Sequence, residues 1–141
     1  MRSWEEYVKG GIVRRTQINK GTIKSLIGMS ENRLKIFSEM KLTEQNASVL
    51  FTNYYDSLRE ICEAIAVSKG YKIYLHEAIG LFLRETLKEE AIFVKFDKFR
   101  VMRNGVNYYG TPIPLNEAIQ GIEDIKKIIN QLKPKYLKEF Q

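Results

Sequence analysis

Apolar residues recur at helical spacing along most of the chain, most clearly between Thr43 and Lys69. Steps of three and four residues place these side chains on one face of a helix. Lys69 followed by Gly70 supplies a basic last turn and a glycine stop, which is typical of a helix C-terminus. The inward face of this predicted helix consists of Ala47, Leu50, Phe51, Tyr54, Leu58, Ile61, Cys62 and Ile65.

The same spacing predicts four further long helices and a short N-terminal one. Ser3, with Glu6 three residues later, has the spacing of a capping box, so the short helix should begin there. A firm break over residues 110–114 separates the last two helices, because its two prolines lack an amide donor. The predicted ranges are 3–9, 16–39, 75–87, 89–109 and 115–140.

Details inside these helices are also predicted. Leu75 should open the inward face of its helix, and Ile119 should lie on the inward stripe of the last one. Pro134 should kink that last helix or end its regular part. No segment alternates as a strand does, so residues 71–74 are expected to be a short connection. Because the loops are short, the expected fold is all-α, an antiparallel up-and-down bundle of about five helices in one domain over residues 1–141.

Composition limits the function classes. The 141 residues carry a net charge of +6, which permits a nucleic-acid or nucleotide partner without requiring one. No apolar run is long enough to span a bilayer, and the N-terminal segment does not resemble a signal peptide, so a cytoplasmic protein is expected. The single Cys62 lies on an apolar face and is expected to be buried. With one Cys and one His the chain predicts no metal site, and no cofactor is expected.

The end of the helix predicted over 89–109 carries an unusual polar face. Its apolar stripe through Phe96 and Phe99 turns polar in the last two turns. Burying such groups without partners costs several kcal/mol, so they should be paired with each other, or face a cleft or a subunit boundary. Guanidinium groups suit phosphate, Asn can orient a phosphate or base edge, and Tyr can stack on a base. The candidate nucleotide- or RNA-binding residues are Arg100, Arg103, Asn104, Asn107 and Tyr108.

His76, the only histidine, stands near the start of the helix predicted over 75–87. One interpretation is a polar or packing contact at a helix start. The other is an accessory role at the candidate site, as a general base or a nucleotide contact.

Two segments resemble the HEPN superfamily of helical nucleotide-associated domains. One is Arg103-Asn104 with a following tyrosine, a break and a final amphipathic helix. The other is the segment from Ile61 through Gly70, followed by a helix that opens at His76-Glu77. Together they cover about residues 43–140. The resemblance implies a homodimer whose arginines face a shared cleft, and a toxin–antitoxin-type pair with a minimal nucleotidyltransferase as partner.

The chain departs from that family's ribonuclease motif. Family ribonucleases have an Arg, a polar residue and then a His, with four to six residues between the Arg and the His. Counting from Arg103, the His should occupy position 108, 109 or 110, which hold Tyr108, Tyr109 and Gly110. Tyr, with a pKa near 10, transfers protons poorly compared with His. The resemblance therefore favours a binding or partner role over catalysis.

Three interpretations follow from the sequence. The first is a HEPN-like protein that binds a nucleotide or RNA through Arg103 and its neighbours. The second is a ribonuclease with a departed motif that uses Arg103, Asn104 and Tyr108, with His76 as a further participant. The third is a non-catalytic module whose polar face serves only a dimer interface.

Overall fold

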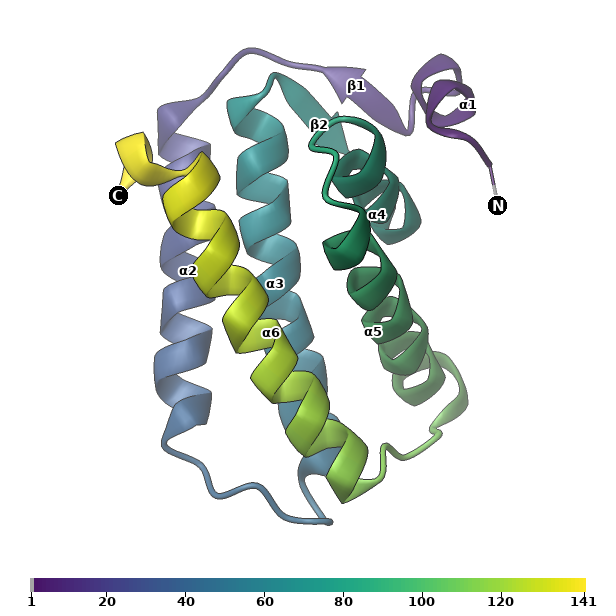
Figure 1. Ribbon diagram of the computed structural model, residues 1–141, viewed down its shortest axis with the longest axis vertical. Coiled ribbons are helices and arrows are strands. Elements are labelled where there is room, and N and C mark those ends of the chain that lie inside the picture. The colour runs from purple at the N-terminus through teal and green to yellow at the C-terminus, as the bar shows by residue number, and fades with distance from the viewer. Residues whose placement is uncertain (1) are drawn as a thin grey trace.

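The computed structural model describes residues 2–141, and over that range it is an all-α fold with six α-helices and one very small sheet. The predicted fold class is confirmed. Four long helices run alternately up and down, as Figure 1 shows. They are α2 (Lys20–Ser38), α3 (Ala47–Ser68), α5 (Glu90–Tyr109) and α6 (Leu115–Tyr136).

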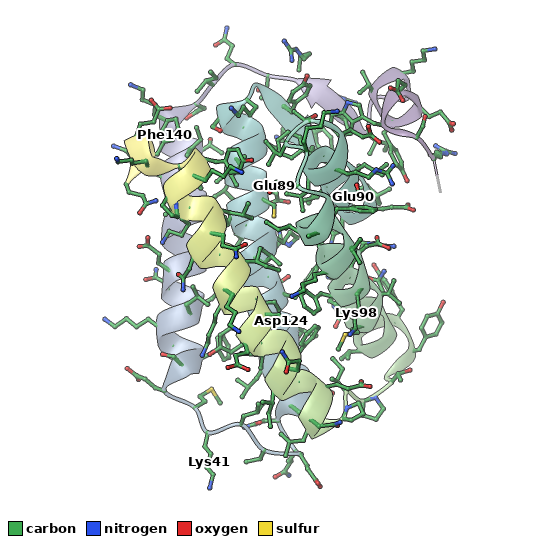
Figure 2. The ribbon with its side chains drawn as sticks, viewed as in Figure 1. Lys41, Glu89, Glu90, Lys98, Asp124 and Phe140 are labelled. Carbon is green, nitrogen blue, oxygen red and sulfur yellow. The ribbon has the colours of Figure 1, made fainter. Side chains whose placement is uncertain are left out.

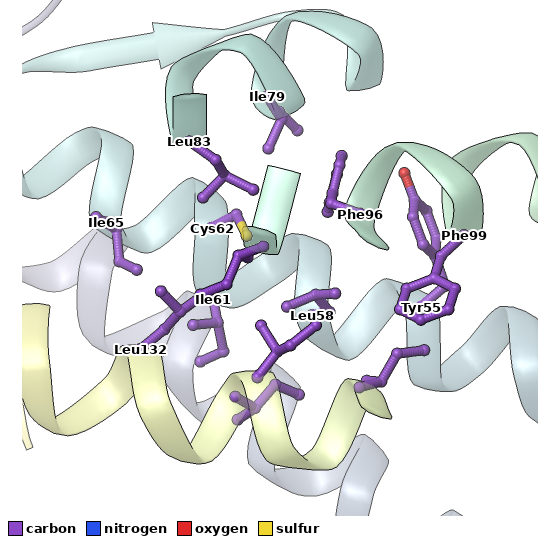
Figure 3. Close-up of a cluster of buried hydrophobic side chains, with 14 of the residues drawn as sticks. Tyr55, Leu58, Ile61, Cys62, Ile65, Ile79, Leu83, Phe96, Phe99 and Leu132 are labelled. Carbon is purple, nitrogen blue, oxygen red and sulfur yellow. The ribbon is translucent and has the colours of Figure 1, made fainter. Parts of the chain in front are cut away.

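Helix α3 lies at the centre of the bundle. Its apolar side chains contact α2 and α6 on two sides, and α5 together with α4 (His76–Glu85) on another, so it is buried over most of its length. The predicted inward face is confirmed, and Cys62 is fully buried. Figure 3 shows how side chains from four helices meet in this core. The labelled members are Tyr55, Leu58, Ile61, Cys62, Ile65, Ile79, Leu83, Phe96, Phe99 and Leu132.

Helices α4 (His76–Glu85) and α5 pair as an antiparallel hairpin. A Cβ built at Gly80 would lie 3.4 Å from ring atoms of Phe93 and Phe96, so this position of α4 packs directly on those two rings of α5. The Arg84 guanidinium lies 4.7 Å from the centre of the Phe93 ring. Later positions of α4 thus contact earlier positions of α5, which places the start of α4 beside the second half of α5, at Arg100 and Arg103.

The prediction that residues 71–74 form no strand was wrong. Strand β1 (Val13–Arg15) pairs antiparallel with β2 (Tyr71–Ile73), with Val13 opposite Ile73 and Arg14 opposite Lys72. Each strand has three residues, too few for alternation to be visible in the sequence. The sheet fixes the N-terminal segment, with α1 (Trp4–Lys9), against the exit of α3.

Several helix ends differ from the predictions. Leu75 is 41% exposed, because it is the extended N-cap residue of α4 and precedes the helix. Ile119 is 50% exposed on α6 and not on its buried stripe. Pro134 lies inside α6, which continues to Tyr136 before the 3₁₀ turn η1 (Lys138–Phe140). The predicted cap is confirmed at Ser3, whose Oγ accepts from the amide of Glu6 at 3.2 Å.

Among the described residues, the charged side chains reach the outside of the bundle except Glu60, which is buried and accepts from Arg33 Nε at 2.9 Å. In Figure 2, Lys41 in the α2–α3 loop points away from the helices. Asp124 of α6 lies 3.8 Å from the ammonium of Lys95 on α5 and joins these two helices at the surface. None of the described helices combines the length and the apolar character that crossing a membrane requires.

Candidate functional site

A cavity of about 310 Å³ lies where the first turn of α4 faces the last turns of α5. The antiparallel hairpin creates it, since it brings two segments some 25 residues apart to one place. Its walls combine two guanidinium groups, an imidazole, a carboxylate and two phenol rings. The lining residues are Tyr74, Leu75, His76, Glu77, Arg100, Arg103, Asn104 and Tyr108.

Helix α5 supplies the cationic wall because its burial changes along its length. Phe96 and Phe99 are buried against the core, and they are followed by the half-buried Arg103 and Asn104. The left-handed Gly110 ends the helix, and its amide donates to the carbonyl of Val106 at 3.0 Å. The polar face predicted from spacing therefore faces a cavity and not the packed interior.

Arg103 is held by neutral groups alone. Its Nη1 donates to Asn104 Oδ1 at 3.3 Å. When the Asn107 amide oxygen faces the guanidinium, it accepts from Nε at 3.0 Å and from Nη2 at 3.2 Å. Among residues 2–141, no carboxylate lies within ion-pairing distance of Arg103. A half-buried guanidinium that is oriented but not neutralised is the main electrostatic feature of this site.

Arg100, one turn before Arg103 on α5, is paired with a carboxylate. Its Nε donates to Asp97 Oδ1 at 3.0 Å, an i,i+3 ion pair on the surface of α5. The pair reduces the charge that Arg100 presents, and the terminal nitrogens of its guanidinium make no contact with that carboxylate. Arg100 is consequently the weaker of the two cations.

His76 is anchored to the core through Tyr55. The Tyr55 hydroxyl and His76 Nδ1 lie 3.1 Å apart, in a hydrogen bond whose direction depends on the tautomer. Burial, and then the positive charges of Arg59 and Arg103, lower the pKa of His76 from 6.5 to about 4. His76 is therefore neutral at pH 7. Within the described chain its Nε2 makes no hydrogen bond, which leaves that atom available to a ligand.

Glu77 brings one negative charge to the cavity. Its Oε2 accepts from the hydroxyl of Tyr7 on α1 at 2.6 Å. Burial together with this hydrogen bond raises the pKa of Tyr7 to about 12, so the phenol stays protonated as a donor. The contact ties α1 to the start of α4 and keeps part of the Glu77 carboxylate occupied.

Two exposed phenol rings stand at the cavity. Tyr108 is 68% exposed, and the Arg103 guanidinium carbon lies 6.0 Å from its ring centre. Tyr74 is 52% exposed. Such rings are suited to stacking on a flat ligand group, because their faces are not covered by the protein core.

Five of the six residues predicted from the sequence line this one cavity, including His76 from another helix. The sixth, Asn107, does not line it and instead orients Arg103. The sequence reasoning missed Tyr74 and Glu77, although both flank His76 closely in the chain. It also missed Tyr55, whose apolar surroundings on α3 carry no sign of its contact with His76.

A larger cavity, about 840 Å³, lies between the β1–α2 loop, α3 and β2. Its half-buried carboxylate, Glu63, is already paired, since Arg59 Nη1 donates to it at 3.0 Å. Lys20 and Lys72 line it as well, among apolar side chains and neutral polar groups. Among residues 2–141, its lining holds no arginine and no histidine, the groups that distinguish the α4–α5 cavity.

Comparison of the chain with protein-family models, with curated proteins and with solved structures finds no match. The candidate site therefore rests on its own geometry.

Proposed function

We propose that the α4–α5 cavity binds a phosphate group of a nucleotide or RNA. The main observation in support is Arg103, a half-buried guanidinium oriented by two asparagine side chains, with no carboxylate of the described residues within ion-pairing distance. Keeping a cation partly out of water without a counter-ion is unfavourable. A bound phosphate supplies that counter-ion and accepts charge-assisted hydrogen bonds from the planar donor fork.

The groups around Arg103 favour a phosphate ligand over a smaller anion such as a carboxylate. Arg100 adds a second guanidinium, and the neutral His76 can donate from Nε2 when its Nδ1 accepts from Tyr55. Tyr108, exposed beside Arg103, offers a ring on which a base can stack. The cavity of about 310 Å³ suits one phosphate with part of its nucleoside.

Isothermal titration with uridine monophosphate, at low and physiological salt, tests the proposal. Arg103→Ala should weaken binding roughly 10-fold or more, because a hydrogen bond to a charged group contributes about 1.5–3 kcal/mol. Lys98→Ala is the matched control, since Lys98 is an exposed cation of the same helix outside the cavity. Equal affinity in the wild type and in Arg103→Ala, with both folded by circular dichroism, would overturn the proposal.

A ribonuclease is a second candidate, favoured by the position of His76 in the cavity of Arg103. Positions 108–110, where the ribonuclease motif of HEPN domains would have its histidine, hold none, but His76 supplies an imidazole from a different helix. In the tautomer that donates Nδ1–H to Tyr55, Nε2 is a base. It would take the proton of a ribose 2′-hydroxyl while that oxygen attacks phosphorus, the bond to the 5′-oxygen breaks and the leaving oxygen takes a proton from water. A bound phosphate would raise the pKa of His76 towards a useful range.

Cleavage of a labelled RNA by the purified wild type tests this second candidate. Activity that is lost in both His76→Ala and Arg103→Ala supports it, and activity equal in all three proteins indicates a contaminant.

A homodimer, a nucleotidyltransferase partner and a toxin–antitoxin-type role remain expectations from the resemblance to HEPN domains. A dimer interface that uses the polar face predicts that Arg103→Ala shifts the monomer–dimer balance in sedimentation. It also predicts no binding of uridine monophosphate at physiological salt, which separates it from the phosphate proposal.

A further inference from the structure

The outward face of the two-stranded sheet holds an exposed ring close to two cations. The guanidinium carbon of Arg14 and the ammonium of Lys72 each lie 5.3 Å from the centre of the Tyr74 ring. Lys72 and Tyr74 share this face because side chains alternate along a strand, and Arg14 is the cross-strand partner of Lys72. We call these three residues the sheet clamp.

The two cations of the sheet clamp repel each other. Like charges directly opposite each other on paired strands destabilise a sheet, and Arg14 and Lys72 stand in that relation. Within residues 2–141 neither side chain forms an ion pair, and both are exposed. The Arg14 guanidinium is nevertheless fixed in place, since its Nε donates to the carbonyl of Gly11 at 2.9 Å. An anion bound between the two cations would relieve their repulsion.

The sheet clamp adjoins the α4–α5 cavity through Tyr74, which belongs to both. Tyr74 thus lines the cavity proposed to bind phosphate, and its ring also contacts Arg14 and Lys72. Alternating cations and exposed aromatic rings along a surface are the arrangement that binds single-stranded nucleic acid, in which phosphates meet the cations and bases stack on the rings. A mononucleotide in the cavity would leave the sheet clamp unused.

We propose that the sheet clamp of Arg14, Lys72 and Tyr74 is a second nucleotide subsite, so that the ligand is a single-stranded oligonucleotide. This inference rests on the proposed function of the cavity. One phosphate lies at Arg103, and the chain continues past Tyr74, where a base stacks and the next phosphate meets Arg14 and Lys72.

Fluorescence anisotropy with a labelled single-stranded decamer, alongside titration with uridine monophosphate, tests the subsite. The decamer should bind at least 10-fold more tightly than the mononucleotide, and Tyr74→Ala should remove about 10-fold of decamer affinity. Tyr74→Phe keeps the ring and should bind like the wild type. Arg14→Ala and Lys72→Ala should weaken the decamer, each lowering its salt dependence by about 0.7 in slope, and leave the mononucleotide unchanged within about 2-fold.

Lys41→Ala is the control for charge, because Lys41 is exposed at the end of the bundle opposite the sheet. Comparing RNA and DNA decamers of one sequence shows which of the two nucleic acids the subsite binds. The subsite is overturned if the decamer binds no more tightly than the mononucleotide, if a duplex binds as tightly as the single strand, or if Arg14→Ala and Lys72→Ala leave decamer affinity unchanged. The proposed phosphate site in the cavity fails separately: it is wrong if Arg103→Ala leaves the affinity for uridine monophosphate unchanged.

Discussion

The hydroxyl of Tyr55 and Nδ1 of His76 lie 3.1 Å apart and connect the buried centre of α3 to the wall of the α4–α5 cavity. Tyr55 is fully buried, so its ring position is set by the core, and the hydrogen bond transmits that position to the imidazole. His76 is thereby held with Nε2 unoccupied beside two arginines. His76, for which the sequence left open a contact at a helix start and an accessory role, thus lines the candidate site.

This environment predicts a pH-dependent stability. Folded His76 has a pKa near 4, whereas the unfolded chain protonates it near 6.5. Between these values the unfolded state binds more protons, so stability should decline as pH falls from about 6.5 to about 4, by on the order of 2 kcal/mol. Urea denaturation of the wild type and of His76→Gln at several pH values measures the effect. Identical pH profiles for the two proteins would rule out the buried neutral imidazole.

Removal of the Tyr55 hydroxyl should leave the His76 imidazole without the hydrogen bond that positions it. Tyr55→Phe keeps the ring in the core but leaves Nδ1 without its partner, which should cost about 1 kcal/mol of stability. The affinity for uridine monophosphate should fall as well, because the imidazole is no longer held. The expected result in calorimetry is a folded variant with weaker binding. Unchanged binding would show that the contact matters only for packing.

Glu77 should oppose anion binding, because its carboxylate lines the same cavity as the arginines. Glu77→Gln removes that charge and keeps an oxygen to accept from Tyr7. Affinity for uridine monophosphate should rise about 5-fold at low salt and less at high salt, since exposed charges are screened. Weaker binding in Glu77→Gln would mean that the carboxylate contacts the ligand as an acceptor.

Close packing between α3 and α6 makes a further prediction about the fold. A Cβ at Gly121 would lie 2.8 Å from Cε2 of Phe51, so Gly121→Ala should lower the free energy of unfolding by about 1–3 kcal/mol. Gly28→Ala is the matched control, because open space surrounds that position on α2. It should stabilise the protein by up to about 1 kcal/mol. Thermal unfolding of both variants gives the comparison, and equal effects would contradict the packing.

Periodicity predicted the long helices and the polar end of α5, because both depend on residues close together in the chain. The sequence indicated His76 as a candidate accessory residue, but periodicity did not place Glu77 and Tyr74 at the same cavity, because the packing of α4 on α5 joins residues far apart in the chain. The strands were missed for a related reason. Their pairing joins residues far apart in the chain, and three residues show no alternation. The inward position predicted for Leu75 was wrong, because this residue is the extended N-cap that precedes α4 and is not part of its apolar stripe.

His76 provides a direct probe of the candidate site, because it is the only histidine in the chain and gives one imidazole signal in an NMR spectrum. The measurement is a pH titration of that signal with and without saturating uridine monophosphate. We expect the pKa of His76 to be near 4 in the free protein and to rise when the phosphate binds, with no such rise in Arg103→Ala. An imidazole signal that uridine monophosphate leaves unchanged in the wild type at every pH would contradict phosphate binding in the α4–α5 cavity.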